Sequence, residues 1–291
     1  MLFNIFIKIN SCVYRMRDYT KKSSMSILLI LIMLILSSFI ASVHVKAEES
    51  NVLEVDQNGN YNYTSIREAI NNAKEGDIVY VYNGIYYENL LIDKSINLVG
   101  ENQEETIIDG QEKTDVILIT ANYVNITGFT IQNAGFYLYN NGIDVDSSHN
   151  IIANNTIQRC RCGIALELWP NDCRIFKNTF YENSFGIMAY SIHNNRNLIY
   201  ENNFLKNYHN AYDDSKGQWS YNGQGNYWDD YNGTDNDGDG VGDTPYEING
   251  GTTKDHYPLI EPVQTPGFEI ILMIAAIVTM YIFKRRNKGY L

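Results

Sequence analysis

The chain has 291 residues, a formal net charge of −12 and 44% hydrophobic residues. Most of its acidic side chains lie in residues 48–266, which hold 32 Asp and Glu against 12 Lys and Arg. A surface of this charge repels a phosphate polymer, so nucleic-acid binding is excluded, whereas cations and neutral, hydroxyl-rich partners suit it.

Residues 1–47 have the features of a leader followed by a secretory signal peptide. Two lysines at 21 and 22 precede an apolar run over residues 27–41, and Val45 and Ala47 supply small side chains where a signal peptidase cleaves. We therefore expect cleavage after Ala47 and export of the residues that follow. A retained membrane helix is the alternative.

A short amphipathic helix is predicted from Ser65 onward. Ser65 and Glu68 form a capping box, and Gly76 supplies an end signal. The apolar face holds Ile66, Ala69, Ile70 and Ala73. The runs "DIVYVY" and "SINLVG" then indicate strands. Such a helix would cover the open first coil of a solenoid, whose strand edges are otherwise exposed.

Internal repeats are the strongest signal in the chain. Three 18-residue segments that begin at Asn150, Cys173 and Asn197 align without gaps, at offsets of 23 and 24 residues, and a looser copy begins near Tyr123. A period in the low twenties with three short β-branched or aromatic runs per unit predicts one coil of a β-solenoid.

An asparagine recurs at the same place in successive units, namely Asn155, Asn178 and Asn202. Asparagine tolerates left-handed backbone and can bond to a stacked neighbour, so we expect a ladder at a corner of a parallel β-helix.

Residues 52 to 262 resemble a known family. The opening "GDIVYVYNGIYYENLLIDKSINLVGE" and the unit "GFTIQN" are similar to the pectin-lyase-like right-handed β-helices, and more narrowly to their NosD-like branch. The resemblance implies an all-β, right-handed parallel β-helix over 48–225 with a short N-terminal capping helix. It implies no single activity, because this architecture carries lyases, hydrolases, epimerases and binding proteins.

The NosD-like resemblance also implies copper handling as an alternative function. Copper prefers imidazole, thiolate or thioether ligands. His149, His193 and His209 occupy non-equivalent repeat positions, and His256 lies beyond the repeats. Copper is therefore the less favoured cofactor.

Alignment of the turns at Gly142, Gly163, Gly186 and Asn210 predicts a candidate site. Alternation along the strands sends Asp146, Glu167, Tyr190 and Asp214 outward in one column, beside a second column of Asp144, Ala165, Met188 and Tyr212. Because coils stack at about 4.8 Å, stacked carboxylates could split their pKa values and act as acid and base.

The catalytic candidates are thus Asp146, Glu167 and Asp214, and the sugar-stacking candidates are Trp169, Tyr190 and Tyr212. A solvated acidic strip is the simpler alternative. Because the negative surface resists anionic polymers, neutral glycans are the expected ligands and uronate lyase chemistry is disfavoured.

The segment "TDNDGDGVGD" at residues 234–243 predicts a divalent-metal loop, with candidate ligands Asp235, Asp237, Asp239 and Asp243. Hard carboxylate oxygens in a flexible glycine-containing loop favour Ca²⁺. Tyr246 stands where an EF-hand carries its bidentate glutamate, so the spacing is more similar to a thrombospondin type 3 repeat. We expect a structural Ca²⁺ clasp in an aromatic-rich closure over 226–263. A solvated acidic turn is the alternative.

Residues 264–291 end the chain with "PGF", an apolar run over 270–283 and a basic cluster. Fourteen helical residues at 1.5 Å each span only about 21 Å of a hydrocarbon core of about 30 Å. The order resembles the sorting signal that archaeal surface proteins present to an archaeosortase, which implies replacement of the helix by a lipid. We expect a membrane-anchored cell-surface protein.

Two smaller features complete the sequence. Cys160, Cys162 and Cys173 are odd in number, which indicates packed thiols, with thiolate metal binding as the alternative. Four sequons suit a glycosylated surface protein, at Asn62, Asn125, Asn154 and Asn232. The leading functional prediction is a surface structural or carbohydrate-binding module, with a glycan hydrolase or lyase and a copper-handling accessory protein as alternatives.

Overall fold

The computed structural model describes residues 50–137, 140–168, 170–190, 196–215 and 217–264. The predicted signal peptide, the C-terminal sorting segment from residue 265, Trp169 and His193 lie outside these residues. Within the described ranges, the structure contains no helix of the length and hydropathy needed to cross a bilayer.

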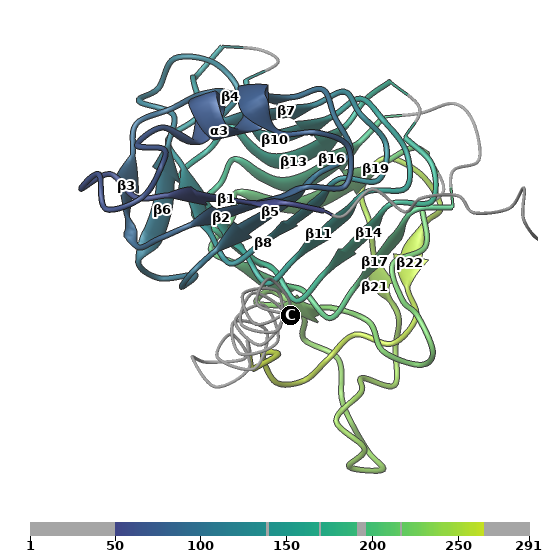
Figure 1. The fold of residues 1–291 in the computed structure, drawn as a ribbon. Helices are drawn as coiled ribbons and strands as arrows, with labels where there is room; N and C mark the ends of the chain where they lie inside the picture. Colours follow the sequence, from purple (N-terminus) through teal and green to yellow (C-terminus); the bar gives the residue numbers. More distant parts are fainter. Residues whose placement is uncertain (1–49, 138–139, 169, 191–195, 216, 265–291) are drawn as a thin grey trace, which may run out of the picture. The chain divides into compact units, whose positions relative to one another are not determined.

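Three parallel sheets form the walls of a β-helix (Figure 1). Each coil gives one strand to each sheet in turn, so neighbours in a sheet belong to successive coils. Sheet A contains β1 (Val52–Val55), β2 (Ile78–Val81), β5 (Asn97–Gly100), β8 (Asn125–Thr127), β11 (Ile151–Ala153), β14 (Arg174–Phe176) and β17 (Leu198–Tyr200).

The other two walls follow the same rule. Sheet B contains β3 (Gly84–Tyr86), β6 (Thr106–Asp109), β9 (Thr130–Gln132), β12 (Thr156–Gln158), β15 (Thr179–Tyr181), β18 (Asn203–Leu205) and β20 (Tyr227–Trp228). Sheet C contains β4 (Leu90–Ile92), β7 (Ile117–Ile119), β10 (Asn141–Val145), β13 (Cys162–Leu166), β16 (Phe185–Ala189) and β19 (His209–Asp213). The predicted all-β, right-handed parallel β-helix is confirmed.

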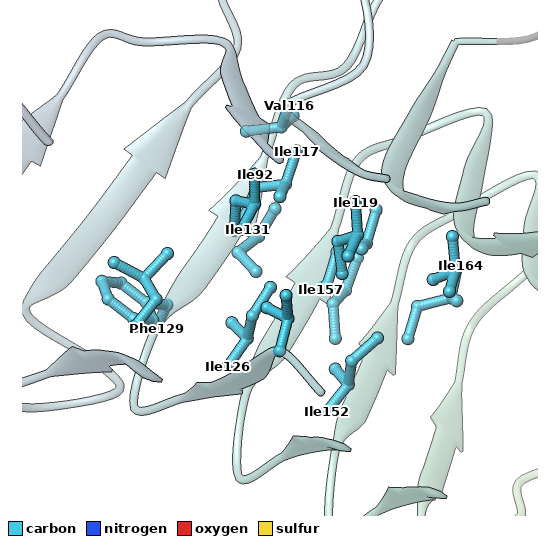
Figure 2. Packing of buried hydrophobic residues seen from close by; sticks show 14 of the residues in the cluster. Ile92, Val116, Ile117, Ile119, Ile126, Phe129, Ile131, Ile152, Ile157 and Ile164 are labelled. Atoms are coloured by element: carbon cyan, nitrogen blue, oxygen red, sulfur yellow. The ribbon is translucent and has the colours of Figure 1, made fainter. Parts of the chain in front are cut away.

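The core is built from inward side chains that stack from coil to coil. Ile126 pairs with Ile152 and Ile131 with Ile157, and Figure 2 shows these isoleucines inside the coils. All four are almost fully buried. Burial of such a side chain stabilises the fold by roughly 1.5–3 kcal/mol, so a repeated apolar position in the sequence becomes a continuous core column.

The predicted asparagine ladder is present and fully buried. Asn155 donates from Nδ2 to Oδ1 of Asn178 at 3.2 Å, and Asn178 donates to Oδ1 of Asn202 at 3.1 Å. The ladder continues to Asn226 and ends on the Asp255 carboxylate, which accepts the Asn226 backbone N–H at 2.6 Å. Each amide therefore satisfies backbone groups of its own coil and of the preceding one, as Asn178 does with the carbonyl oxygens of Phe176 and Ile152.

The expected left-handed backbone lies one residue earlier than predicted. Positive φ angles occur at Asn154 (55°), Lys177 (56°) and Glu201 (52°), directly before the ladder asparagines. The corner thus turns at a residue with an exposed or half-buried side chain, and the following asparagine is buried to bond to its neighbours. The placement of this turn at the ladder residues themselves was wrong.

The N-terminal helix α3 (Ile66–Asn72) contacts β1, β2 and β4 and covers the first coil, as predicted (Figure 1). The Ser65 side chain accepts the Glu68 backbone N–H at 3.2 Å. The sequence did not indicate a second cap, in which the Glu88 carboxylate accepts the backbone N–H groups of helix residues 66 and 67. The helix ends at Asn72 rather than at Gly76, which forms the next turn with a φ of 83°.

Aromatic side chains close the other end of the β-helix. The rings of Phe180, Phe204, Trp228 and Tyr246 stack in sequence, with centroid distances of 4.9, 4.3 and 4.1 Å. Tyr246 belongs to a small antiparallel pair, β21 (Tyr246–Glu247) and β22 (Lys254–Asp255). Because the ring stack extends from the buried Phe180 to Tyr246 on the β21–β22 strand pair, the closure extends the hydrophobic core as well as covering the last coil.

Candidate functional site

The outer face of sheet C carries the two columns that the repeats predict. Parallel pairing places Asp144, Ala165, Met188 and Tyr212 side by side in successive coils. Two residues further along each strand, the same register aligns Asp146, Glu167, Tyr190 and Asp214. We call these eight residues the sheet C strip.

The N-terminal half of the sheet C strip is acidic. Asp144, Asp146 and Glu167 are joined there by Asp115, which precedes β7 and accepts the Asn141 backbone N–H at 2.6 Å. Burial raises the pKa of each of these four carboxyls, and repulsion from neighbouring acids adds to the rise at Asp115, Asp144 and Glu167. Arg161 partly opposes the rise in the pKa of Glu167.

Asp144 is the most perturbed member of this group. Its side chain is only 9% exposed, and its Oδ1 is buried without a hydrogen-bond partner among the described residues. Desolvation first, and then repulsion from Asp115, Asp146 and Glu167, raise the pKa of Asp144 to about 7, and a side-chain hydrogen bond with Asn141 opposes this rise in part. A neutral carboxylic acid can therefore persist on this face near neutral pH.

The C-terminal half of the sheet C strip is aromatic. The Tyr190 and Tyr212 rings lie 5.2 Å apart between centroids, and Tyr190 is 38% exposed. Ala165 and Met188 form a buried floor together with Cys162, and Tyr212 packs against them. A small, flat apolar floor beside tyrosine rings is suited to a planar or ring-shaped ligand.

The structure distributes the predicted catalytic residues unevenly. Asp146 and Glu167 are neighbours in adjacent coils and both are half-buried. Asp214 lies two coils beyond Glu167, with Tyr190 between them, and its side chain is exposed. Of the predicted stacking residues, Tyr190 and Tyr212 lie together and Trp169 is outside the described residues.

Two acidic residues of the site were not among the catalytic candidates. Asp144 was placed in the neighbouring column, but its burial could not be seen from the repeat pattern. Asp115 belongs to a coil outside the gap-free repeats, and the only signal that could have found it is its position just before "VILI" in the preceding coil. Both omissions concern the environment of a side chain and not the register.

The acidic loop brings three of its four predicted ligands together. One carboxylate oxygen from each of Asp235, Asp237 and Asp239 lies within 4.8 Å of the others, and no other group of three His, Cys, Asp or Glu side chains in the described residues meets this distance. Asp243 instead accepts the backbone N–H of Asn236 at 2.9 Å. The Asp235 carboxylate accepts the Gly238 and Gly240 N–H groups at 2.7 and 2.9 Å, which lowers its pKa.

The cysteines are packed thiols in the described residues. Cys160, Cys162 and Cys173 are buried and free, and burial raises the pKa of each. His149 stacks on Tyr123, whereas His209 lies against Phe185. These two histidines are therefore held in separate aromatic contacts.

The fold and its repeats define a right-handed parallel β-helix. Residues 145–233 match the family model described as "Periplasmic copper-binding protein (NosD)". This range includes most of the sheet C strip, from Asp146 to Asp214, and begins one residue after Asp144.

Two curated relatives match part of the chain. A probable ABC transporter binding protein NosD from Stutzerimonas stutzeri is 31% identical over 119 residues, which is 40% of this chain and 21% of the relative. The protein of the same description from Pseudomonas aeruginosa is 44% identical over 78 residues, 25% of this chain and 18% of the relative. The chain thus spans about a fifth of the length of these relatives.

Among solved structures, pectin methylesterase from carrot is similar with a TM-score of 0.40 and 14% identity, over 55% of this chain and 67% of that structure.

Proposed function

We propose that this protein is an exported β-helix whose sheet C strip binds a neutral glycan. Tyr190 and Tyr212 present ring faces for the apolar faces of sugar units, over the buried floor of Ala165 and Met188. The neighbouring carboxyls of Asp146 and Glu167 can accept hydrogen bonds from sugar hydroxyls. The observation that carries the proposal is this continuous row of aromatic and acidic groups along one sheet.

Charge selects a neutral ligand in this proposal. Burial raises the pKa values of four carboxyls on this face, and repulsion among them adds to the rise for some: Asp115, Asp144, Asp146 and Glu167. A uronate carboxylate bound here would therefore meet further repulsion. The excess of acids over bases in residues 48–266 acts in the same direction at longer range. A hydroxyl-rich polymer avoids both costs.

Affinity gel electrophoresis tests this proposal with xylan, mannan, galactan and mixed-linkage glucan as neutral probes and polygalacturonate as the anionic comparison. We expect retardation by at least one neutral polymer. Loss of one stacking ring should weaken binding in Tyr212→Ala by roughly 5- to 30-fold, because a ring contact contributes about 1–2 kcal/mol.

The matched control is Tyr123→Ala, which removes an exposed tyrosine at the turn before β8, away from the strip. It should bind like the wild type. Equal weakening in both variants, or retardation only by polygalacturonate, would refute the neutral-glycan proposal.

We also propose that Asp235, Asp237 and Asp239 hold Ca²⁺ as a structural clasp. Their oxygens lie close together, and none of the three has a salt-bridge partner among the described residues. A hard divalent cation would offset their mutual repulsion and tie the loop to the closure, and Asp243 holds the two ends of the loop through Asn236. Ca²⁺ would supply no chemistry here beyond this tie.

Copper handling is the lesser alternative, and the description of the matched family model names copper binding. The soft ligands that lie together on the described surface of sheet C are Cys162 and Met188. Because Cys162 is fully buried and its pKa is raised, a metal would first have to displace its proton in a closed site.

The proposed localisation is the cell surface. The protein would be anchored there through its C-terminal segment or through a lipid that replaces this segment.

A further inference from the structure

We propose that this protein carries N-linked glycans at two of its four sequons, Asn62 and Asn232, and that the fold withholds the other two, Asn125 and Asn154, from modification. The sequence treats the four alike, because each asparagine is followed two residues later by threonine. The inference depends on export of the chain and is independent of ligand binding by the sheet C strip.

The sequon at Asn62 lies in the turn between β1 and α3. Its middle residue, Tyr63, forms a parallel bridge with Val55 and packs against the hydrophobic core. Asn62 and Thr64 on either side are exposed, and neither side chain has a hydrogen-bond partner in the described part of the chain. Tyr63 therefore fixes the turn from inside, while the amide and the hydroxyl that define the acceptor stay accessible on the surface.

The sequon at Asn232 repeats this arrangement in the C-terminal closure, after β20. Its middle residue, Gly233, faces the closure so closely that a Cβ there would collide with the Tyr231 hydroxyl. Asn232 and Thr234 are exposed on either side. The Asn232 amide has no hydrogen-bond partner within the described ranges, and Thr234 Oγ1 accepts a hydrogen bond from the Asn236 amide at 3.2 Å. The acceptor amide is again accessible on a fixed turn.

The sequon at Asn125 lies within a wall of the β-helix. It belongs to β8, which pairs with β5 on one side and β11 on the other. Asn125 Nδ2, the atom that would carry a glycan, donates to Asn97 Oδ1 at 2.6 Å, and both Asn125 and Thr127 are half-buried. A glycan here would break this hydrogen bond and lie across the outer face of sheet A.

The sequon at Asn154 lies in a corner of the coil. Asn154 is half-buried with a φ of 55°, and its Oδ1 is buried without a hydrogen-bond partner among the described residues. The next residue is Asn155 of the buried ladder, and Thr156 Oγ1 already accepts a hydrogen bond from Gln103 Nε2 at 2.8 Å. A transferase could reach this sequon only by opening the corner, which would break buried hydrogen bonds.

Glycan transfer needs an activated donor, an oligosaccharide esterified to a lipid phosphate. Nδ2 of the asparagine bonds to the anomeric carbon as the bond between that carbon and the phosphate oxygen breaks. The lipid phosphate leaves with the bonding electrons, and a base of the transferase takes one of the two Nδ2 protons. No oxidant or reductant takes part.

The two proposed glycans would lie at opposite ends of the β-helix. Asn62 directly precedes the helix that covers the first coil, and Asn232 follows β20, the last strand of sheet B. Bulky hydrophilic groups at these places would hinder end-to-end association of the solenoid. They would also leave the sheet C strip open to its ligand.

The experiment is peptide mapping by mass spectrometry of the full chain, exported by a host that N-glycosylates its own surface proteins. A secreted reporter with one exposed sequon, made in the same cells, verifies that the transferase is active. We expect added glycan mass on the peptides of Asn62 and Asn232 and unmodified peptides for Asn125 and Asn154. One folded wild-type protein reports all four sites, so the comparison requires no variant to fold.

Variants then test each acceptor. Asn62→Gln and Asn232→Gln should each lose one glycan from the intact mass, and the double variant should lose both. Thr64→Ala should lose the glycan at Asn62, whereas Thr64→Ser should keep it because serine also supplies the hydroxyl. The matched control is Asn71→Gln, which makes the same change at an exposed asparagine of α3 outside any sequon and should keep both glycans.

Each outcome decides a separate statement. An unmodified Asn62 or Asn232 in cells that glycosylate the reporter refutes the proposal at that site. A glycan on Asn125 or Asn154 refutes the protection by the fold. Retention of the unmodified chain inside the cell refutes the export on which the proposal depends. Binding by the sheet C strip is measured separately by affinity electrophoresis, so its failure is distinguishable from all three.

Discussion

Single residues in this protein acquire their chemistry from what surrounds them. Asp93 and Asp144 both lie on the outer side of sheet C, yet Asp93 is exposed and Asp144 is nearly buried among other acids. Asp144 is desolvated and is repelled by the neighbouring acids, and both effects disfavour its charged form. Aspartate is thus an exposed surface side chain in one coil, and two coils later it is a nearly buried side chain whose pKa is raised.

This difference predicts a pH dependence of stability. The pKa of Asp144 is about 7 in the folded protein and about 3.9 in an unfolded chain, so the folded state binds the extra proton between these values. Its contribution to the unfolding free energy is therefore fully present below about pH 4 and is lost as the pH rises to about 7. The loss should be on the order of 4 kcal/mol over the whole range, since each pKa unit corresponds to about 1.4 kcal/mol.

Urea unfolding of the wild type and Asp144→Asn at pH 5 and pH 8 measures this contribution. The variant cannot ionise, so it should lose less stability than the wild type over this range. Parallel losses in the two proteins would show that Asp144 ionises normally in the fold. Asp93→Asn should behave like the wild type.

Elements in this fold are stabilised by repetition across coils more than by their own length. Most strands have three to five residues, too short to be stable alone, but within the three walls every strand except the first and last of its sheet pairs on two sides. The corners repeat as well, since each ladder asparagine satisfies backbone groups in two coils. A defect in one coil should therefore destabilise its neighbours.

Asn178 provides the sharpest test at this scale. Its amide donates to Ile152 O at 2.8 Å and accepts the Asn155 N–H at 3.1 Å, and all these groups are buried. Asn178→Ala leaves them unpaired, so the unfolding free energy should fall by roughly 2–4 kcal/mol. Thermal or urea unfolding measures the change.

The control for Asn178 is Asn71→Ala, which removes an exposed amide from α3. Alanine favours a helix, so this variant should be unchanged or slightly stabilised. If the two variants lost the same stability, the ladder would not be a source of cohesion between coils.

At the scale of the whole molecule, the two ends of the β-helix are closed by different means. The N-terminal coil is covered by α3 with its Ser65 and Glu88 caps. The C-terminal coil is closed by the ring stack from Phe204 through Trp228 to Tyr246, and the acidic loop emerges from this closure. Since exposed sheet edges invite pairing with other chains, both closures protect the solenoid from association.

The proposed Ca²⁺ clasp belongs to this scale because it ties the closure together. A ligand present at 100 times its dissociation constant should raise the melting temperature by roughly 5–10 °C in a domain of this size. We expect this rise in millimolar Ca²⁺ for the wild type and its loss in Asp237→Ala. Asp93→Ala, which removes a carboxylate far from the loop, should retain it. A rise of the same size in all three proteins would contradict the clasp.

The sequence alone determined the coil, its register and most of its corners. A gap-free repeat of 23 to 24 residues can bury its apolar positions only by stacking, so the neighbours of Asp146 and Asn178 follow directly from alignment. The capping helix was equally readable, because its capping box and apolar face are local signals.

Only the tertiary structure decided which side chains are buried and which charges lie beside them. Asp144 became the central acid because other coils remove it from water and surround it with negative charge, and Asp115 joined it from a coil outside the aligned repeats. The left-handed turn lies one residue earlier than predicted for a similar reason, since the asparagine side chain is needed inside the corner. Periodicity specifies which residues are neighbours, whereas desolvation depends on everything that covers them.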